Sequence, residues 1–589
     1  MTRPTAQWTL REAPAAAPGA AEALARSLRS SPLVARLLLQ RGMGDATRAG
    51  AFLSPRLDSL GAPGSLPDMD RAADRLARAV RERERIAVCG DYDVDGMTGT
   101  SLLVRFFRLA GADVTWAIPD RDTDGYGLSA AGVDRLAAAG VRVAVTVDNG
   151  VSAHEALERA RELGIDVVVT DHHLPGPTLP PAVAIVNPNR RDAPPPAPGA
   201  PCGCALAYKT AWAVAERLRH LLGGEAGVRF KAFLRDAMGL VALATVADVV
   251  DLVGENRVLV AHGLASLRNS PHPGLKALRE SAELGALPLT TQDIGFKLAP
   301  RLNAAGRLGK PGLVIELLTT DDAQRAQQLA QELTQANEER RRIERAVLDQ
   351  AIPHAESLLG DGQRRSLVVH GEGWHKGVIG IVAARLVDLH ARPTVVIGFD
   401  GGSGRGSCRT SPDVDLHRAL TACGQHLTRY GGHAMAAGLE IERHAVEGFA
   451  ERFEEAVREQ LGDALPGRRT LWADLEAHVD EWDLATAEDL QRLAPFGAGN
   501  PEPCFLLRGA QVAGRARLMG QEGAHLSFAL KQRTGAIRVI GFRQAGLYDV
   551  AASGQPLDLL VHPMVNEFRG TRTAELRLVD ARPSGQGSA

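Results

Sequence analysis

Four short apolar runs dominate residues 86 to 170 and limit the folds that this chain can adopt. They read IAVCG, VTWAI, VAVTV and DVVVT, and stretches of helical composition rich in alanine and leucine separate them. Regular alternation of strand and helix indicates βαβ units, whose strands pair in parallel. We therefore expect an α/β domain with a parallel sheet in the first half of the chain.

The length of 589 residues is too great for one ordinary domain. The first 80 residues have a helical and polar pattern, and a second α/β pattern starts near Ser366. Further on, many short strands separated by turn signals predict a small β-barrel or sandwich. The expected segments are 1–80, 81–320, 321–352, 353–465 and 466–589.

The composition argues against several classes of protein. The formal net charge is −2, which disfavours a wholly basic nucleic-acid coat but leaves room for a local basic groove. No apolar run approaches about 18 residues, so we expect no membrane span, and the N-terminus lacks the apolar core of a signal peptide. The six cysteines are dispersed, and the pair Cys202 and Cys204 is interpreted as structural. These features predict a cytoplasmic protein with reduced thiols.

A long polar helix is expected from about Asp321 to Gln350, with apolar side chains along one stripe. At about 1.5 Å per residue it would span roughly 45 Å, enough to join two lobes. Pro353 should kink or end it. We interpret its NEERRRIER stretch as a solvated face, with contact to nucleic acid as the alternative.

Acidic and histidine side chains follow the strands of the first lobe. DYDVDG, with Asp91, Asp93 and Asp95, follows the first strand, and VDNG, with Asp148, follows the third. TDHH follows the fourth strand, and VADVV follows a buried helix predicted at residues 232 to 247. Because ligands bind beyond the carboxyl ends of parallel strands, these clusters should meet at one edge of the sheet. An isolated VDNG would be interpreted as a turn or a cap, but several acidic clusters at one edge indicate a site.

So many carboxylates cannot all stay ionised without cations. At an effective dielectric of about 20, two carboxylates about 4 Å apart repel by about 4 kcal/mol. Carboxylates with one or two imidazoles suit Mn²⁺, tolerate Mg²⁺ and can hold Zn²⁺ or Co²⁺. Two ions that share carboxylates are a common device for phosphoester hydrolysis, because they activate water and stabilise both the attacking and the leaving oxygen. The sequence thus predicts a centre for two Mn²⁺ or Mg²⁺ ions.

The second α/β pattern offers donors for phosphate. RGSCRT places Arg405, Ser407 and Arg409 in what we expect to be a glycine-containing loop, where arginine can form two hydrogen bonds to a phosphate. By itself this motif is weak, and a solvated loop is an equal alternative. GGHAMAAG places His433 behind two glycines, where the backbone can approach a ligand, and His375 in GWHKG is a similar candidate.

Taken in order, DYDVDG, VDNG, TDHH and VADVV resemble the motif series of the DHH phosphoesterase superfamily. A closer resemblance, to the RecJ family of single-strand-specific DNA exonucleases, extends through PRLNAAGRL, GEGWHKGVIGIVAARL, RGSCRT, GGHAMAAG and LAPFGAGNPEP. These motifs cover most of the chain and are jointly very specific. One departure is CGCALAYK, where the family pattern C-G-x-G has a second glycine, and we expect it to affect local packing alone.

The resemblance implies a fold of four parts. They are a parallel-sheet DHH domain, a long connecting helix, a second α/β DHH-associated domain, and a C-terminal OB-like β-barrel with a short tail. It also implies an activity, metal-dependent hydrolysis of single-stranded DNA from 5′ to 3′ with release of 5′-mononucleotides, acting in recombination and repair.

By resemblance, metal ligands and catalytic residues can be assigned. The expected ligands are Asp93, Asp95, Asp148, His172 and Asp248, with Asp91 and His173 as further ligands or as side chains that orient the site. The expected catalytic residues are Asp93, Asp95, Asp148, His172 and His433, the last through contact with the scissile phosphate.

The residues that the resemblance implies for DNA binding come from both lobes. Arg307, Ser407 and Arg409 would hold the 5′-terminal phosphate, which would fix the direction of digestion. Apart from the resemblance, Tyr126, in DGYGL beyond the second strand, is expected to stack on a base, since such stacking tolerates any sequence. The complete expected set is Tyr126, Arg301, Asn303, Arg307, His375, Ser407, Arg409 and His433.

Two other functions remain open on the sequence. One is a DHH phosphodiesterase for short oligonucleotides or cyclic dinucleotides, whose relatives need neither the long helix nor the C-terminal domain. The other is a DNA-binding scaffold without catalysis, which the intact acidic residues disfavour. The expected partner is single-stranded DNA. From the resemblance alone we also expect single-strand-binding protein and a RecQ-type helicase as partners, and a monomer that works at the nucleoid of a bacterial cytoplasm.

Overall fold

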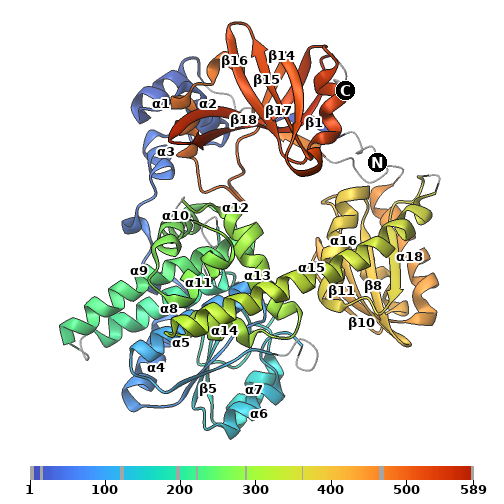
Figure 1. Cartoon of the computed structure of the whole chain (residues 1–589). Helices are drawn as coiled ribbons and strands as arrows, with labels where there is room; N and C mark the ends of the chain where they lie inside the picture. Colours follow the sequence, from blue (N-terminus) through green and yellow to red (C-terminus); the bar gives the residue numbers. More distant parts are fainter. Residues whose placement is uncertain are drawn as a thin grey trace.

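The computed structural model of this chain describes residues 6–12, 17–119, 125–193, 199–219, 223–285, 288–360, 362–462 and 470–585, and the statements below concern these ranges. Figure 1 shows two α/β lobes joined by helix α15 (Ala323–Leu359), with a β-rich domain above them. The predicted boundary between residues 465 and 466 falls in 463–469, outside the described residues.

A parallel sheet of five strands forms the centre of the first lobe, in the order β3-β2-β4-β5-β6. Alternate side chains of each strand face opposite layers of helices. Ile86 and Val88 belong to a core shared with α4, α5 and α8, whereas Ala87 and Cys89 belong to a core shared with α6 and α7. The strands are β2 (Ile86–Cys89), β3 (Val114–Ala117), β4 (Val143–Val147), β5 (Asp166–Thr170) and β6 (Ala184–Val186). The helices are α4 (Met69–Glu82), α5 (Val94–Leu109), α6 (Ala130–Ala138), α7 (His154–Glu162) and α8 (Gly203–Leu218).

Further helices complete the first lobe on the side of α5 and α8. The apolar stretch predicted at residues 232 to 247 forms the buried end of α9 (Gly223–Ala247). Between α12 and α13, residues Ile294–Leu298 form a single π-helical turn, η3. The remaining helices are α10 (Gly254–Asn269), α11 (Pro273–Ser281), α12 (Thr291–Asp293), α13 (Ala299–Arg307) and α14 (Gly312–Thr319).

Helix α15 joins the lobes as predicted, but the expectation that it ends near Gln350 was wrong. It has 37 residues and continues past Pro353 to Leu359, so its length is about 55 Å. A proline inside a helix removes one backbone hydrogen bond. Ala351 and Ala355, on either side of Pro353, are fully buried against the second lobe, and this packing offsets the loss.

The second lobe has a mixed sheet of five strands in the order β10-β11-β9-β8-β7. Strands β7 and β8 pair in parallel and the other pairs are antiparallel. Helix α16 shares a core with α15 and β7, while α17 and α18 share a core with the other face. The strands are β7 (Leu367–Glu372), β8 (Thr394–Asp400), β9 (Ser403–Arg409), β10 (Arg429–Gly432) and β11 (Ala436–Glu442), and the helices are α16 (Lys376–His390), α17 (Leu416–Ala422) and α18 (Val446–Leu461).

The C-terminal domain is a closed barrel, because β14 pairs with both β15 and β17 in the sheet order β14-β15-β16-β18-β17. The predicted small barrel and the predicted four-part α/β architecture are thus confirmed. The strands are β12 (Thr470–Ala473), β13 (Leu475–Glu476), β14 (Phe505–Met519), β15 (His525–Gln532), β16 (Gly535–Gly541), β17 (Leu557–Phe568) and β18 (Thr571–Pro583), with helices α19 (Leu484–Gln491) and α20 (Tyr548–Ala552).

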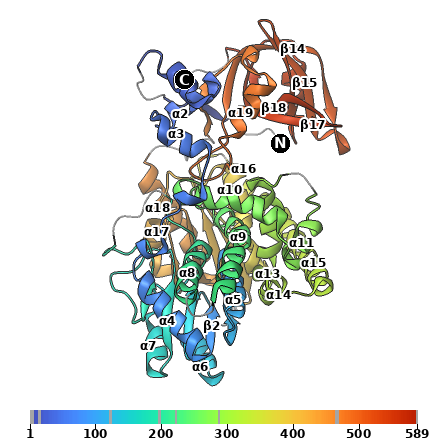
Figure 2. The same cartoon turned by 90° about the vertical axis from the view of Figure 1, so that its left-hand side faces the viewer.

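The N-terminal helices α1 (Ala20–Leu28), α2 (Pro32–Gln40) and α3 (Ala46–Leu53) lie beside this barrel, as Figure 2 shows for α2 and α3. The apolar side of α2, including Leu37 and Leu38, shares a core with Phe505. Strand β1 (Gln7–Leu10), which the sequence pattern did not reveal, pairs in parallel with β12. The two ends of the described chain therefore build one domain.

Among the described helices, none is both long enough and apolar enough to cross a membrane.

Candidate active site

The DYDVDG motif begins directly after β2, at the carboxyl edge of the parallel sheet. Asp93 caps α5, its Oδ1 accepting a hydrogen bond from the Gly96 N–H at 3.0 Å. Gly96 is required for close packing, because a Cβ there would lie 2.5 Å from the Asp91 nitrogen. Asp95, the second residue of α5, is buried. The cap thus directs several carboxylates toward one edge of the sheet.

Asp148 follows β4 at the same edge. Its φ of 63° lies in the left-handed region, which aspartate tolerates better than most residues. The Asp148 N–H donates to the Thr170 carbonyl of the neighbouring strand at 2.9 Å, and the Tyr126 hydroxyl donates to the Asp148 carbonyl at 2.8 Å. These bonds hold a buried carboxylate in a strained position at the end of the sheet.

Acidic side chains from three motifs converge on the ring of His172. Its Nε2 lies 3.0 Å from Asp148 Oδ1, 3.7 Å from Asp95 Oδ2 and 3.6 Å from Asp248 Oδ2. These four residues come from the ends of β4 and β5, from the start of α5 and from the end of α9. The spacing allows Asp95, His172 and Asp248 to share one ion, and Asp148, His172 and His173 to share another.

Asp95 is held by two backbone amides that the sequence analysis did not identify as part of the site. The Gly203 N–H donates to Asp95 Oδ2 at 2.6 Å and the Cys204 N–H donates to Oδ1 at 2.7 Å. Both belong to the first turn of α8, whose positive dipole end favours the carboxylate. A Cβ at Gly203 would lie 2.5 Å from Asp148 Cβ, so only glycine fits. The signal was the glycine at the start of a buried helix, in the CGC pair that we interpreted as structural.

His173 lies beside this cluster and has its own acidic partner. Its Nδ1–H donates to Asp171 Oδ1 at 2.7 Å, and both ring nitrogens lie 3.3 Å from the Tyr126 hydroxyl. Burial raises the carboxyl pKa, but the hydrogen bond and charge of His173, together with the backbone N–H groups of His173 and Val151, outweigh it and leave the pKa of Asp171 below its ordinary value. Burial likewise lowers the pKa of His173, and Asp171 reverses this and raises it. The pair therefore fixes the orientation of the His173 ring.

The central carboxyls show the opposite behaviour. Burial, reinforced by the charge of Asp93, raises the pKa of Asp91 to about 8. Burial and the charge of Asp95 raise the pKa of Asp248 to about 8 and the pKa of Asp148 well above its ordinary value. Burial also lowers the pKa of His172, against the pull of the nearby carboxylates. Without a cation, this site disfavours its own charges.

The donor set fits divalent cations. Asp91 Oδ1 is a buried atom without a hydrogen-bond partner among the described residues, and Asp148 Oδ1 and His172 Nε2 are buried 3.0 Å apart without forming a hydrogen bond. Leaving such groups unpaired is costly. Carboxylate oxygens with one or two imidazole nitrogens suit Mn²⁺ and Mg²⁺, and a bound cation stabilises the ionised carboxylates. Asp91 and Asp93 lie outside both groups of candidate ligands.

Arg405, Ser407 and Arg409 lie on strand β9, and the predicted loop at RGSCRT was wrong. Because alternate residues of a strand face one side, these three side chains share a face. On the other face, Gly404 and Gly406 allow close packing, since a Cβ at Gly406 would lie 2.7 Å from Leu439 Cδ1. Arg409 Nη1 donates to Ser407 Oγ at 3.2 Å. The glycines therefore allow close packing within the sheet, while the Ser407 and Arg409 side chains lie against Gly380 of α16, where a Cβ would be 3.0 Å from Ser407 Oγ.

The two histidines predicted in this lobe occupy different settings. His375 caps α16, its Nδ1 accepting a hydrogen bond from the Gly377 N–H at 3.0 Å. His433 is exposed in the hairpin between β10 and β11, where its N–H donates to the Ala436 carbonyl at 2.9 Å. Gly432, at a φ of 140°, is required by this hairpin. His433 thus has an accessible ring on a tightly defined turn.

Arg307 connects the acidic motif to the second lobe. It ends α13, and the preceding Gly306 lies so close to the Tyr92 carbonyl that a Cβ there would be 2.0 Å from it. Arg307 Nη1 donates to the Gly377 carbonyl, in the first turn of α16, at 3.0 Å. Arg301, by contrast, donates to the backbone carbonyls of Lys297 and Ser281. A cavity adjoins the end of α13, and its lining includes Asn303 but not Arg301.

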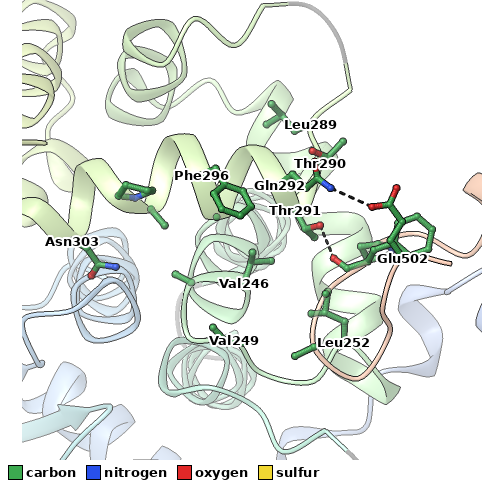
Figure 3. Close-up of a pocket in the computed structure, with 18 of the residues that line it drawn as sticks. Val246, Val249, Leu252, Leu289, Thr290, Thr291, Gln292, Phe296, Asn303 and Glu502 are labelled. Atoms are coloured by element: carbon green, nitrogen blue, oxygen red, sulfur yellow. Dashed lines mark hydrogen bonds between the residues drawn. The ribbon is translucent and has the colours of Figure 1, made fainter. Parts of the chain in front are cut away.

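This cavity has a volume of about 1690 Å³ and lies where the first lobe, α15, α16 and the loop 491–502 meet. Figure 3 shows the loop tied to α12: the Thr291 hydroxyl donates to the Phe496 carbonyl at 2.6 Å, and Gln292 Nε2 donates to Glu502 at 3.4 Å. The arginines that line the cavity are Arg268, Arg307, Arg340, Arg341, Arg345, Arg385, Arg543 and Arg577.

Three of these arginines belong to the NEERRRIER stretch, in which Arg341 and Arg345 are exposed, as expected for a solvated face. Arg340, Arg341 and Arg345 line the cavity from α15. Burial lowers the pKa of Arg340, and the charges of Arg341 and Arg385 lower it further, despite the opposing effect of Glu344. Glu344 and Asp349 also line the cavity from α15, and Arg340 pairs with Glu344, so the positive charge that suits a polyanion comes from Arg341 and Arg345.

Comparison with known proteins accounts for all three domains. Family models described as the DHH family N-terminal domain, the DHHA1 domain and the RecJ OB domain match residues 85–245, 364–459 and 473–580. The single-stranded-DNA-specific exonuclease RecJ of Dickeya dadantii is 37% identical over 559 residues, which cover 92% of this chain and 95% of that protein.

Two more relatives extend this similarity. The single-stranded-DNA-specific exonuclease RecJ of Bacillus subtilis is 33% identical over 569 residues, covering 96% of this chain and 69% of that protein. The crystal structure of RecJ in complex with Mn²⁺ from Thermus thermophilus is similar with a TM-score of 0.82 at 31% identity, covering 99% of this chain and 80% of that one. Sequence similarity and fold agree along nearly the whole chain, which therefore belongs to the RecJ family of single-stranded-DNA-specific exonucleases.

Proposed function

We propose that this protein is a Mn²⁺- or Mg²⁺-dependent exonuclease that digests single-stranded DNA from its 5′ end and releases 5′-mononucleotides. The observation that carries the proposal is the buried acidic cluster around His172, which disfavours its own charge and adjoins a cavity lined by arginines. An acidic site suits the cations, and a basic cavity suits the phosphates of the strand.

In this proposal Asp93, Asp95, Asp148, His172 and Asp248 hold two divalent ions. When bound, the ions would supply Lewis acidity, activating water and stabilising the charge that develops on phosphate oxygens. The amides of Gly203 and Cys204 keep the Asp95 carboxylate oriented. Asp171 fixes the His173 ring, which with Asp91 is either a further ligand or a side chain that orients the site.

The second lobe would bind the end of the strand. Ser407 and Arg409, adjacent on one face of β9, would hold the 5′-terminal phosphate together with Arg307. His433, on its exposed hairpin, would contact the scissile phosphate, and His375 at the start of α16 would assist. Tyr126 lies about half exposed at the edge of the acidic cluster, where its ring can meet a base.

The arginine-lined cavity would carry the strand from the barrel toward the acidic cluster. Its lining includes Asn303 and Arg307, one turn apart at the end of α13, and also Arg543 and Arg577 of the barrel domain. A relative that cleaves only dinucleotides needs neither this length of cavity nor a barrel. The geometry therefore favours a long single strand over a small cyclic substrate.

The cellular setting is also part of the proposal. The six cysteines are free and buried, as expected in a reducing compartment, so we place the enzyme in the bacterial cytoplasm at the nucleoid, in recombination and repair. Single-strand-binding protein and a RecQ-type helicase would supply the strand to a monomeric enzyme. The predicted segments 81–320 and 353–465 would act as the metal-binding and phosphate-binding lobes, with 321–352 in the helix that connects them. The segment 466–589 would bind the strand together with the helices of 1–80 that pack against the barrel, and the end of 1–80 leads into the first lobe.

The test is digestion of a long single strand labelled at one end or the other, in the presence of Mn²⁺. The proposal expects the 5′ label to appear at once as a mononucleotide while the 3′ label stays in shortening strands. Survival of the strand while short oligonucleotides or cyclic dinucleotides are cleaved would overturn it in favour of the small-substrate alternative. A duplex of the same sequence serves as the control and should resist digestion.

A further inference from the structure

The first turn of α10 carries two buried polar side chains whose role the proposed function leaves open. Asn256 is fully buried and Arg257 is 2% exposed. Helix α10 follows the α9–α10 turn, residues 248–253, which begins with Asp248. Taking an amide or a guanidinium out of water is costly unless hydrogen bonds compensate. The hydrogen bonds of these two side chains therefore show which parts of the molecule they hold in place.

The Asn256 side chain joins two segments of the chain that lead to the acidic cluster. Its Nδ2 donates to the carbonyls of Gly199 and Ala200, at 3.0 and 3.1 Å, and to the Asp251 carbonyl at 3.1 Å. A reversed amide would place Oδ1 against three carbonyl oxygens, so this orientation is the favourable one. The amide therefore fastens residues 199–200 to the α9–α10 turn.

Both of these segments lead to ligands of the same candidate ion. The first segment runs into α8, whose first amides hold the Asp95 carboxylate, and the α9–α10 turn begins with Asp248. Asp95 and Asp248 share one group of candidate ligands with His172, whereas Asp148 and His173 complete the other group. The Asp248 side chain is 27% exposed and that of Asp95 is 0% exposed, so Asp248 depends more on the position of its backbone. The asparagine amide therefore helps to fix the distance between two ligands of the first ion.

The α9–α10 turn is strained. Val249, next to Asp248, has a φ of 57°, which is rare for a β-branched residue. Its side chain is 71% exposed, so burial of that side chain does not hold the conformation. Strained backbone persists only where its surroundings fix it. The hydrogen bond from Asn256 helps to fix this turn, and its loss should let the turn relax and carry the Asp248 carboxylate away from His172.

Arg257 joins the same turn of α10 to the barrel domain. Its Nη2 donates to the Ala494 carbonyl at 2.7 Å, and its Nε donates to the Phe52 carbonyl at 2.8 Å. The guanidinium also lies 3.8 Å from the centroid of the Phe52 ring. Longer hydrogen bonds reach the carbonyls of Arg492 and Pro495, at 3.3 and 3.4 Å. The buried cation therefore holds α3 and the loop of the barrel domain at once.

The same loop also touches the α9–α10 turn directly. The Leu252 N–H donates to the Ala498 carbonyl at 2.8 Å, and Figure 3 shows Leu252 beside the loop. A Cβ at Gly497 would lie 2.8 Å from Leu252 Cδ1, and a Cβ at Gly499 would lie 2.9 Å from Asp251 Cβ. The loop therefore packs closely against the turn, and the two glycines on either side of Ala498 make this approach possible.

We propose that Asn256 and Arg257 are positioning residues through which the loop of the barrel domain keeps Asp248 in place for its ion. The barrel domain is then part of the metal centre as well as a strand-binding domain. Both side chains act through the backbone, because their hydrogen bonds end on carbonyl groups of the segments that lead to the ligands. This deepens the proposed function and rests on it, since it names what supports one of the two ions.

The first test titrates Mn²⁺ into the full chain by calorimetry, in the absence of DNA. The wild type should bind two ions. Asn256→Leu keeps the size of the side chain but removes its donors, so it should weaken one of the two binding events about 10-fold or more and leave the other nearly unchanged. The smaller change Asn256→Ser should act in the same direction, and it replaces the leucine variant if that variant does not fold. Two binding events of wild-type affinity in a folded variant would overturn the proposal.

A second buried asparagine separates positioning from a merely structural role. Asn337, on α15, is 2% exposed and accepts a hydrogen bond from Arg340. Asn337→Leu should lower the thermal midpoint in EDTA, as Asn256→Leu does, but it should leave both Mn²⁺ binding events unchanged. Equal weakening of Mn²⁺ binding by the two variants would show a general loss of stability and would contradict the positioning role.

The second test changes the contact with the barrel domain, which contributes no candidate ligand among the described residues. Gly497→Ala inserts a methyl group against Leu252, and Arg257→Met keeps the length of the side chain without its donors. Both should weaken the same Mn²⁺ binding event several-fold. Gly546→Ala is the matched control, because nothing lies within 4 Å of a Cβ at that position of the barrel domain. Wild-type Mn²⁺ binding by both variants would overturn the proposal.

These results are separable from failure of the proposed function. If the wild type binds no Mn²⁺, or does not digest single strands from the 5′ end, the proposed function fails whatever the variants do. If the wild type binds two Mn²⁺ ions and digests single strands, and the variants bind both ions like the wild type, the positioning role alone is wrong.

Discussion

The two α/β lobes put charges of opposite sign next to each other, and they do so by different means. In the first lobe, acidic side chains are buried, held by backbone amides, and left with unpartnered atoms. In the second lobe and on α15, the cationic and hydroxyl groups lie on β9, α16 and the long helix, partly buried in the case of Ser407 and Arg409 and exposed in the case of Arg341 and Arg345. The first arrangement needs cations before it can work, while the second is ready to bind phosphate as it stands.

This difference separates two tasks that one site must combine. A carboxylate cluster repels the phosphates of DNA unless cations intervene, and a basic surface cannot hold divalent cations. Because the carboxylate cluster and the basic surface lie on different lobes, the protein can bind divalent cations tightly and DNA phosphates tightly at the same time. Variants in the two lobes should therefore fail in different ways, and the following predictions use this contrast.

The largest effect is expected for Asp148→Asn. Asparagine preserves the size of the side chain and tolerates the left-handed backbone, but it removes the charge at the centre of the cluster. Hydrolysis with Mn²⁺ should fall by about 10³-fold, corresponding to about 4 kcal/mol of transition-state stabilisation. The rate of mononucleotide release measures this. Asp134→Asn, an exposed carboxylate paired with Arg159, is the control and should retain the wild-type rate.

A smaller and more selective effect is expected for Arg409→Gln. Loss of a charged hydrogen bond of about 1.5–3 kcal/mol should lower kcat/KM by about 10- to 100-fold on strands with a 5′-phosphate. Strands with a 5′-hydroxyl should be affected little. Arg405→Gln is the matched control, since Arg405 shares the face of β9 but pairs with Glu440. Equal losses on both kinds of strand would exclude recognition of the terminal phosphate.

The stability of the protein in a chelator should fall as pH rises. Asp91 and Asp248 have a pKa of about 8 in the folded protein, above the ordinary carboxyl value, so the folded state binds more protons than the unfolded state between about pH 4 and 8. Stability is therefore present at low pH and lost as pH rises through 8, and the raised pKa of His173 acts in the same direction. Thermal midpoints measured in EDTA from pH 5 to 8 would show this. Added Mn²⁺ should remove the decline, and a midpoint that rises with pH would contradict the account.

The smallest effect is expected on the basic wall of the cavity. Arg341→Gln and Arg345→Gln should each weaken strand binding a few-fold, and should lower the slope of log affinity against log salt by about 0.7 for one lost phosphate contact. Anisotropy titrations across a range of salt concentrations measure both. Arg342 is the control, because it pairs with Glu339 on α15 and does not line the cavity.

The acidic lobe was the more predictable of the two from sequence. Strand ends in a parallel sheet meet at one edge, so the positions of Asp148 and His172 follow from the βαβ pattern and the motif order. The phosphate-binding lobe was less so. A glycine-rich RGSCRT is equally compatible with a loop or with a strand packed tightly against its neighbour, and only the contact between Gly406 and Leu439 decides this.

Features that depend on contacts between distant parts of the chain could not be predicted from the sequence. Pro353 predicts the end of a helix locally, but burial of its neighbours against β7 and α16 keeps α15 intact. The helices near the N-terminus carry apolar stripes without any sign that their partner is a barrel more than 400 residues away. The amides that hold Asp95 were equally hidden, because a backbone donor leaves no side-chain signature.

The separation of tasks between the lobes is tested most directly by calorimetric titration of Mn²⁺ into the wild type, Asp148→Asn and Arg409→Gln. The account predicts that Asp148→Asn loses Mn²⁺ binding, whereas Arg409→Gln binds Mn²⁺ as the wild type does. Wild-type affinity in Asp148→Asn, or an equal loss in Arg409→Gln, would contradict it.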